Sequence, residues 1–574
     1  MIAIVAVLMV VTMTLILGTT GLRFARTTSN FFVASRSVHP VWNAFAVCGE
    51  AMSAASYLGV PALLMIFGPD LLWPVAGWTA GFLLLSLFIA APMRRFGSYT
   101  IPEFVEGRLD SPALRTIVAI MVIVASWFFF LAQLKGAGVV TRALIGTPYW
   151  VGVVAVGLLV ATNLSAGGMR GITFVQGFQF FFIFAGILIP FLVITSFWFR
   201  GDVDPIITDS PPIFAVDTEV EYPNEITIIV NEATAVSGVG SIDGAALDNV
   251  GLNLDVGPHV VSAMTVATWP AGTLVPHAEG IEPLTGTAWS EALGDKNLSG
   301  GSPLYFSIAS FIANMFGLCA LPHVVVRFYT TRTGRSARRT NVYVLALITP
   351  YYAMLPMFAA VGRVVSPSVL SNGTTDAITV LVGELLVPGP GGELLTAIVA
   401  AGAVAAFLST SSGLLIAIAG AVSHDIMKAG IPQFRFAVWG GVAVSILAGL
   451  AVEQVDISVL IGWSTAIAAS SIAPLLLFGI WWPGLTSRGA IASAVTGGTL
   501  STGAVLVSWL GLVESGWPLA IFNTPAAWTV PIAFAVAVVV SKRDRNKVQN
   551  LGHKFALLHV PEIIEDSSRS AARV

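Results

Sequence analysis

Long apolar runs follow one another along most of this chain, with short polar stretches between them. A helix needs about 20 mostly apolar residues to cross the hydrocarbon core of a bilayer. By that measure the pattern predicts thirteen spanning helices. Their expected limits are residues 2–20, 40–67, 70–92, 113–139, 148–166, 172–199, 302–324, 341–364, 393–422, 433–453, 457–481, 487–512 and 520–541.

The composition supports a membrane protein. Of the 574 residues, 56% are apolar and 10% are charged, whereas a soluble protein has about 25% charged residues. The mean hydropathy is +0.84, and no water-soluble fold has enough interior to hide so much apolar surface. We therefore expect an all-α polytopic protein whose main surroundings are the lipid bilayer.

The basic residues orient this layout. The first apolar run has no basic residue before it, while Arg23 and Arg26 follow it, which is the wrong polarity for a signal peptide. With the N-terminus outside, most of the 28 Lys and Arg, Arg327 among them, fall in inside loops or in an inside C-terminal tail, as the positive-inside rule requires. The pattern predicts a multi-pass plasma (inner) membrane protein.

One long segment does not read as membrane. Residues 201–300 contain about half of the 31 acidic residues and a single basic residue, Lys296. Short β-like runs, such as residues 225–230, lie between Gly, Asp and Pro turns. The expected division is a membrane domain at 1–200, an extracellular acidic insert at 201–300, a membrane domain at 301–541 and a cytoplasmic tail with one short helix at 542–574. The insert is a solvated cap, a solute-gathering surface or a partner-binding surface.

Several functional classes are excluded. The net charge of −3 leaves no nucleic-acid footprint, and the two cysteines, Cys48 and Cys319, form no metal or redox motif. The sequence contains no phosphate-binding loop, no HExxH, no GxSxG and no dinucleotide fingerprint. A primary pump needs a nucleotide site, so the pattern favours a secondary transporter that is not an enzyme and couples a small solute to a cation gradient.

A run of hydroxyl side chains lies near the middle of the apolar segment 393–422. Ala406, Ser409 and Thr410 follow one another at i, i+3 and i+4, so they share one helix face. Two hydroxyls and a backbone carbonyl supply about half of the oxygen shell that a bare Na⁺ needs. The alternative is that each hydroxyl bonds back to the carbonyl four residues before it, which is common in membrane helices.

A second cluster interrupts the segment 40–67. Gly49, Gly59 and Pro61 weaken this helix, and small residues fill the stretch between them. A broken helix at membrane depth is tolerated only beside a cavity or an ion, and many transporters build binding sites in this way. Glu50 is a carboxylate inside the predicted membrane, where ionisable residues are usually functional.

The segment 113–139 contains Gln133 and Lys135, and this lysine is the only one inside the predicted spans. Lys135 either extends to the outer interface along its own stem or provides a positive charge for an anionic solute.

The chain resembles the sodium/solute symporter family and, within it, the permeases for acetate and short monocarboxylates. The resemblance covers nearly the whole chain outside the insert and the tail. It rests on residues 52–59 (MSAASYLG), 167–173 (GGMRGIT), 321–330 (LPHVVVRFYT), 406–415 (AFLSTSSGLL) and 423–426 (SHDI).

The resemblance implies a LeuT-type fold with a 5+5 inverted repeat, here the spans 40–199 and 302–481. It also implies one sodium site between the segments 40–67 and 393–422. Carried over position by position, the ligands are the backbone carbonyls of Gly49, Met52 and Ala406 and the side chains of Ser409 and Thr410. Several relatives have an aspartate where this chain has Gln176, so we expect a single coupling ion. Glu50 is a candidate for tuning the ion site or for carrying a proton.

The expected function is sodium-coupled import of acetate, propionate or pyruvate. The solute site should lie beside the break in the segment 40–67, and its candidates are Ser53, Ser56, Tyr57, Gln133, Lys135 and Asn314. Three alternatives stay open. They are a symporter for proline, a sugar or pantothenate, coupling to protons through Glu50, and a transporter-like solute sensor.

Overall fold

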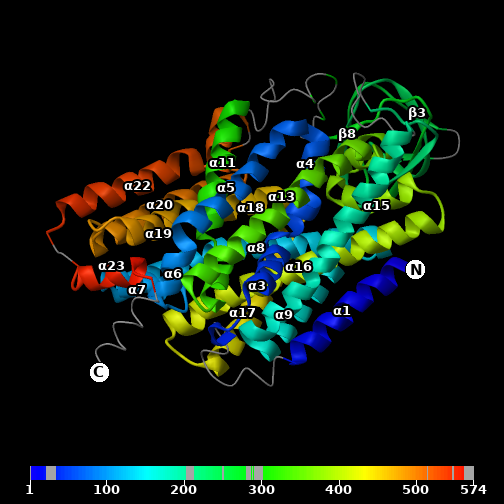
Figure 1. The fold of residues 1–574 in the computed structure, drawn as a ribbon. Helices are drawn as coiled ribbons and strands as arrows, with labels where there is room; N and C mark the ends of the chain where they lie inside the picture. Colours follow the sequence, from blue (N-terminus) through cyan, green and yellow to red (C-terminus); the bar gives the residue numbers. More distant parts are fainter. Residues whose placement is uncertain are drawn as a thin grey trace.

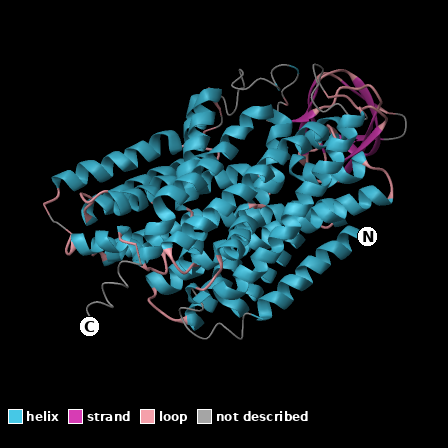
Figure 2. Cartoon of the chain, in the orientation of Figure 1, coloured by secondary structure: helices cyan, strands magenta, loops and turns pink. Residues whose placement is uncertain are grey.

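The computed structural model describes residues 2–20, 34–201, 212–247, 251–279, 283, 286, 289, 302–513, 515–545 and 548–561. Its helices form one elongated bundle, and its strands gather in a small domain at one end of that bundle (Figures 1 and 2). Among these residues, eleven helices are long and apolar enough to cross a membrane, or twelve if one bent pair counts as a span. A shorter apolar helix covers Tyr149–Ser165.

The helices of the first half often begin at a capping side chain. His39, Thr100 and Ser111 each accept a hydrogen bond from a backbone N–H of the first turn, and a proline follows within two residues, where its missing N–H is not needed. The elements are α1 (Ile2–Thr20), η2 (Ala34–Arg36), α3 (Pro40–Ala51), η3 (Ala55–Gly59), α4 (Val60–Phe67), η4 (Gly68–Leu71), α5 (Leu72–Leu84), η5 (Leu85–Ile89), α6 (Ala90–Phe96), α7 (Ile101–Leu109), α8 (Pro112–Ile145) and α9 (Tyr149–Arg200).

The second half continues in the same manner. Its elements are α11 (Pro303–Ala320), α12 (Pro322–Val326), η7 (Arg327–Thr330), α13 (Gly334–Val365), α14 (Ser368–Ser371), η8 (Thr375–Ala377), α15 (Ile378–Leu386), α16 (Pro390–Gly420), η9 (Ala421–Ile426), α17 (Ile431–Ala451), α18 (Ile457–Ser471), α19 (Ala473–Trp481), α20 (Ser487–Trp509), α21 (Gly516–Asn523), α22 (Ala526–Arg543) and α23 (Leu551–His559).

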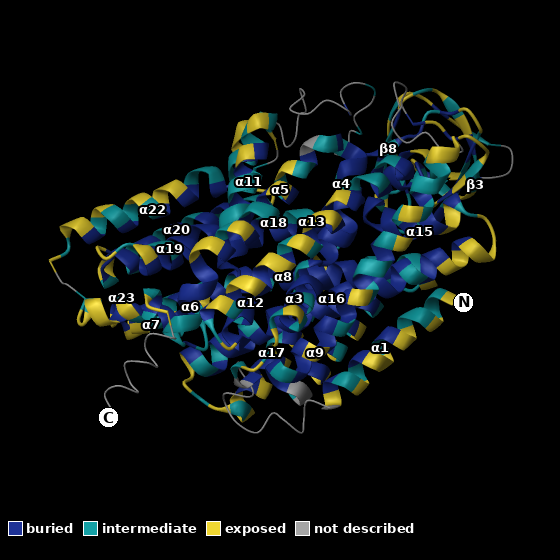
Figure 3. Ribbon diagram, in the orientation of Figure 1, coloured by how far each residue is buried: buried dark blue, intermediate teal, exposed yellow. Residues whose placement is uncertain are grey.

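The helices differ in how much of their surface the protein covers. In the most apolar window of the span containing α16, 89% of the residues are buried, against 17% for α1. Figure 3 shows α16 and α18 in the dark, buried interior of the bundle and α1 at its edge. The hydroxyl-rich run of α16 therefore faces protein rather than lipid.

The helical backbone is broken inside two spanning segments and, in α9, between the helix Tyr149–Ser165 and the span Gly168–Arg200. The chain bends by 59° between α3 and η3. In α9 the backbone leaves the helical region at Gly168, where φ is +57°, a value that favours glycine. Leu321 is extended between α11 and α12, with φ −62° and ψ 120°, just before Pro322. The first and third of these breaks lie in the segments that we expect at equivalent places in the two repeats.

The insert folds as an antiparallel sheet. Its strands are β1 (Thr218–Tyr222), β2 (Ile226–Val230), β3 (Thr234–Ile242), β4 (Ala245–Leu247), β5 (Leu252–Leu254), β6 (Gly257–Val261), β7 (Thr265–Trp269) and β8 (His277–Ala278). The order is β1-β7-β3-β6-β2-β8, with β4 and β5 also paired to β3. Alternate residues of β7, including Ala267 and Trp269, are fully buried, as expected for a sheet with one covered face.

This β-domain is hydrogen bonded to loops between the helices. The Tyr222 hydroxyl lies 2.5 Å from Ser371 Oγ of α14, and Asn372 donates to the carbonyl of Glu221. Asn224 donates to Glu453, in the turn between α17 and α18, over 3.2 Å. The β-domain is therefore hydrogen bonded to two separate places in the second half, the end of α14 and the turn between α17 and α18.

The prediction of a polytopic helical membrane protein is confirmed, while the count of thirteen spans stays a prediction. The label all-α is correct for the helical bundle but wrong for the whole chain, because the insert is a sheet. Arg327 was assigned to an inside loop, yet its side chain is completely buried. Arg23, Arg26 and Lys296 lie outside the described residues. The tail contains one short helix, α23.

Candidate functional site

At the end of α3, where the helix breaks, a side chain of α8 forms a hydrogen bond with the backbone. After Met52 the backbone leaves the helix, with φ −75° and ψ 72°. The freed N–H of Ala54 donates to Gln133 Oε1 over 2.9 Å. Gln133 thus replaces a missing backbone acceptor, which a buried N–H needs. The break is built into the fold rather than being a local irregularity.

The broken segment meets the hydroxyl run of α16. Thr410 Oγ1 donates to the carbonyl of Glu50 over 2.7 Å. A Cβ placed on Gly49 would lie 3.3 Å from Ser409 Oγ and 2.6 Å from the carbonyl oxygen of Gln176. Gly49, Ser409 and Thr410, three of the five residues predicted to bind sodium, therefore lie together.

Ser409 Oγ is buried and has no hydrogen-bond partner within the described part of the chain. By contrast, Ser412 Oγ bonds back to the carbonyl of Leu408 over 2.6 Å. The back-bonding alternative therefore describes Ser412 but not Ser409. Met52 ends α3 and Ala406 precedes Ser409 by one turn, and both are fully buried.

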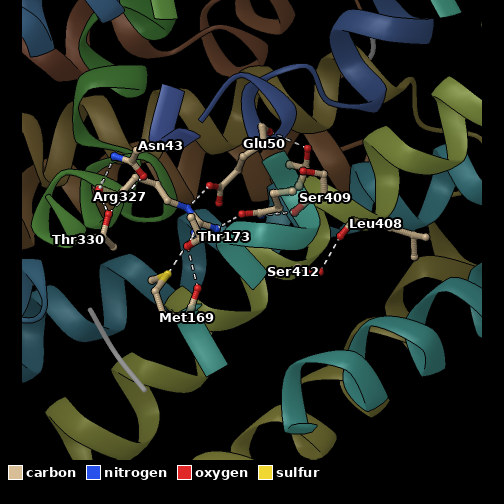
Figure 4. Close-up of polar contacts among 11 residues, drawn as sticks. Asn43, Glu50, Met169, Thr173, Arg327, Thr330, Leu408, Ser409 and Ser412 are labelled. Carbon is tan, nitrogen blue, oxygen red and sulfur yellow. Dashed lines mark hydrogen bonds and ion pairs between the residues drawn. The ribbon is translucent and has the colours of Figure 1, made fainter. Parts of the chain in front are cut away.

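Beside this contact lies a buried ion pair between α3 and η7. Arg327 Nε donates to Glu50 Oε2 over 2.6 Å, and both side chains are at most 1% exposed. Arg327 also donates to Thr173 Oγ1, over 3.0 Å, and to Gln176 Oε1. Figure 4 shows the side chains of Glu50, Thr173 and Arg327 pointing toward one another. A charge pair this deep needs further hydrogen bonds to offset its desolvation, and α9 supplies them.

The network continues to α16. Gln176 Nε2 donates to the backbone carbonyl of Ser409 over 2.7 Å. Asn43 of α3 donates to the carbonyl of Arg327 over 3.1 Å. One chain of polar contacts therefore joins α3, η7, α9 and α16 next to the candidate sodium site.

A small cavity lies on the other side of the α3 break. Its volume is about 10 Å³, roughly the room for one water molecule. The break at Leu321 borders it as well, so it lies between the two interrupted segments. Its walls are Ala51, Ser53, Trp78, Phe129, Leu318, Leu321, His323, Val324, Tyr352 and Thr465.

Of the six predicted solute residues, Ser53 alone lines this cavity. Asn314 accepts a hydrogen bond from the lining residue Thr465 over 2.9 Å. Ser56 Oγ bonds to the carbonyl of Ser53 and lies 3.2 Å from the Tyr351 hydroxyl. Gln133 caps Ala54 instead of facing the cavity.

Tyr57 and Lys135 are engaged elsewhere. The Tyr57 hydroxyl donates to the carbonyl of Val399 over 3.0 Å. Lys135 Nζ donates to the carbonyl of Val455 over 2.6 Å and lies 3.3 Å from Asp376 Oδ2. The lysine therefore has an acidic partner of its own.

Several residues of the site were not predicted from the sequence, among them Arg327, His323, Tyr352 and Thr465. Arg327 and His323 both belong to the run at 321–330 that supported the family resemblance, but neither was assigned a role. The signal was a histidine and an arginine in an otherwise apolar stretch.

The comparisons with known proteins agree with this geometry. The model of the sodium:solute symporter family matches residues 31–204 and 302–497. An uncharacterized symporter of Bacillus subtilis, YwcA, is 26% identical over 92% of this chain and 91% of its own. A monocarboxylic acid transporter of Corynebacterium glutamicum is 25% identical over 95% of this chain and 92% of its own.

Two solved structures share the fold. A Na⁺-coupled sialic acid symporter in an outward-open state has a TM-score of 0.61 at 13% identity, covering 96% of this chain and 99% of its own. Mhp1, a nucleobase-cation-symport-1 transporter, has a TM-score of 0.50 at 11% identity, with 92% and 99% covered.

The family match and the candidate membrane spans identify a multi-pass transporter of the plasma membrane, and the two solved structures show that its fold is LeuT-like. The matched segments make up more than half of the sequence. The chain belongs to the sodium:solute symporter family.

Proposed function

We propose that this protein imports a small monocarboxylate, such as acetate, propionate or pyruvate, together with Na⁺. The single observation that carries the sodium half is the orphaned Ser409 hydroxyl, buried opposite Gly49 at the break of α3. A hard cation such as Na⁺ is attracted to a buried oxygen whose lone pairs accept no hydrogen bond. The monocarboxylate half rests on the cavity and on the Corynebacterium relative.

The sodium ligands are the backbone carbonyls of Gly49, Met52 and Ala406 and the hydroxyls of Ser409 and Thr410. The sialic acid symporter of the same fold is Na⁺-coupled, which supports the choice of ion. Gln176 is neutral and bonded to Arg327, so it leaves no carboxylate for a second ion there. We therefore infer one coupling ion.

The solute binds in the cavity between the two breaks. Ser53, His323, Tyr352 and Thr465 are its polar lining, Trp78 adds an indole N–H, and the remaining side chains are apolar. Such a wall suits a short alkyl tail with a few polar contacts at one end. In the present conformation the cavity has room for about one water molecule, so solute binding needs movement of the surrounding helices.

Ion and solute together carry no net charge when one Na⁺ accompanies one carboxylate. The membrane potential, worth about 2.3 kcal/mol per charge at 100 mV, then does no work on the pair. Uptake follows the sodium gradient alone.

We also propose that the N-terminus and the β-domain face outside and the C-terminal tail faces the cytoplasm. The start of α1 and the β-domain lie toward one end of the bundle and α23 toward the other (Figure 1). The domain boundaries at residues 200, 300 and 541 are part of the same proposal.

Coupling to a proton through Glu50 is the second candidate. The observation in its favour is that Glu50 Oε1 is buried and has no hydrogen-bond partner among the residues described. If a proton bound to this oxygen is the coupling ion, transport requires no sodium site. Uptake in sodium-free buffer with an inward proton gradient separates the two mechanisms.

The deciding experiment is uptake of labelled acetate into proteoliposomes, with and without an inward Na⁺ gradient. The Ser409→Ala/Thr410→Ala variant should lose sodium-driven uptake. The matched control is Ser412→Ala, because this neighbouring hydroxyl bonds within its own helix, and it should transport like wild type. Equal loss in both variants, or no response of wild type to Na⁺, contradicts the proposal.

Competition by unlabelled solutes then tests the substrate. Proline, a sugar or pantothenate that competes better than acetate would keep the mechanism and change the solute. Binding without transport would favour a solute sensor.

A further inference from the structure

His323 is the second residue of α12, directly after the break at Leu321. Its side chain is 1% exposed and lines the cavity. The Nδ1 atom is buried and has no hydrogen-bond partner in the described ranges. An unpaired buried polar atom costs about 1–3 kcal/mol, so a native protein keeps one where a ligand or water completes it.

Packing alone does not explain why a histidine occupies position 323. Its ring meets Phe129 edge to face, with centroids 5.2 Å apart. This contact needs an aromatic ring but neither ring nitrogen. A phenylalanine would provide the same packing without an orphaned atom.

Thr465 and the nearby arginine are less available as donors. Thr465 has one hydroxyl hydrogen, and its acceptors are Asn314 and the carbonyl of Gly462. The lining contains no lysine or arginine, and Arg327, one turn after His323, is bound to Glu50. A carboxylate in this cavity therefore depends on His323, Ser53, Tyr352 and the indole N–H of Trp78 for its N–H and O–H donors.

We propose that His323 is a solute-binding residue that determines specificity by donating a ring N–H to the carboxylate of the transported acid. The alkyl tail then lies against Trp78, Phe129 and Leu318. This inference rests on the proposed function, because it assigns an orientation to the acid in the same cavity. It also places the negative end of the solute beside the α12 break rather than beside Lys135.

The test is equilibrium binding of labelled propionate to the purified protein in Na⁺, with labelled Na⁺ binding measured separately without solute. His323→Phe keeps the ring and removes both nitrogens. His323→Asn places an amide near the position of Nδ1, and His323→Gln places one near Nε2. His553→Phe, an exposed histidine on α23, is the matched control.

We expect His323→Phe to weaken propionate binding about ten-fold or more, the size of a lost hydrogen bond to a charged group. One of the two amide variants should recover most of the affinity. Sodium binding should stay at the wild-type level, and His553→Phe should bind propionate normally. The recovering variant identifies the ring nitrogen that makes the contact.

Unchanged propionate binding in His323→Phe would overturn the assignment while leaving the proposed function intact. Loss of both propionate and sodium binding in all three variants would also overturn it, since His323 would then be structural. If wild type binds Na⁺ but no propionate, the proposed solute fails, and the assignment fails with it.

Discussion

Glu50 and Gly413 are in direct contact across the α3–α16 interface. A Cβ placed on Gly413 would lie 1.4 Å from Glu50 Oε1 and 2.4 Å from its Cδ. The carboxylate cannot swing away without leaving Arg327, which holds its other oxygen. The glycine therefore makes room for the ion pair.

We expect Gly413→Ala to separate α3 from α16 and to abolish sodium-driven uptake. The added methyl group should also lower stability by about 1–3 kcal/mol, as overpacking does. Gly440→Ala on α17 is the matched control, because no atom lies within 4 Å of the added Cβ. Normal uptake by Gly413→Ala would show that the ion pair tolerates displacement.

The Glu50–Arg327 pair should behave as a unit. Removing one member of a buried pair leaves an unpaired charge and costs about 3–5 kcal/mol. Glu50→Gln and Arg327→Met should each lower the apparent melting temperature in detergent, and the double variant should be more stable than either. A double variant as unstable as the sum of the two would contradict the pairing.

A double variant can distinguish two possible roles of Lys135, which are pairing with Asp376 and binding the solute. The lysine and Asp376 are 7% and 12% exposed, 3.3 Å apart. If their pairing is the lysine's role, Lys135→Met should reduce uptake and Lys135→Met/Asp376→Asn should restore much of it. A lysine that binds the solute would not be rescued, and the double variant would stay inactive at all solute concentrations.

The side of the membrane that the β-domain faces can be read with a cysteine label. Cys48 and Cys319 are both buried, so the background is low. Val239 on β3 is 73% exposed, and Val239→Cys should react with an impermeant maleimide on intact cells. Arg332→Cys, in a predicted inside loop, should react only after permeabilisation. The reverse pattern would invert the topology.

A pH response is expected in the β-domain. Partial burial is the largest single effect on His259 and Asp243 and disfavours their charges, but the hydrogen bond of 2.6 Å between them, their backbone hydrogen bonds and their mutual attraction together outweigh it. This bond, with the Asp255 carbonyl, raises the pKa of His259. It also holds the pKa of Asp243 below its usual value, helped by the Val260 N–H.

The raised pKa of His259 gives stability that is full below about pH 6.5 and is lost as the pH rises through the folded value. The lowered pKa of Asp243 gives stability that is full above about pH 4 and is lost as the pH falls through the folded value. Hydrogen exchange of β6 should therefore be slowest, relative to Asp243→Asn, near pH 5. A constant ratio between the two proteins from pH 4 to 8 would contradict this.

The helices could be predicted from the sequence because a spanning segment is recognisable by its length and its apolar composition. The break in the segment 40–67 was also predicted, from Gly49, Gly59 and Pro61. Its position and its cause were not, because Gln133 supplies the cap from another helix. Contacts across the fold leave no local pattern.

The same limit explains the site. Ser409 and Thr410 share a helix face with Ala406, so their grouping could be read from spacing. Arg327 lies 277 positions from Glu50, and its charge fitted an inside loop equally well. Tyr57 was proposed for its place beside the break, but its hydroxyl reaches Val399 between Gly186 and Gly402, which only the packing of α9 and α16 reveals.

The two ends of the bundle carry different attachments. At one end the β-domain is bonded to α14 and to Glu453. At the other, α23 is held by Lys554 to Asp110 and by Arg108 over the Phe555 ring. Inverted repeats alone would give the outward-open and inward-open forms nearly equal free energies. Unequal attachments would remove such a degeneracy, so that the balance between the two forms could be adjusted at either end of the bundle.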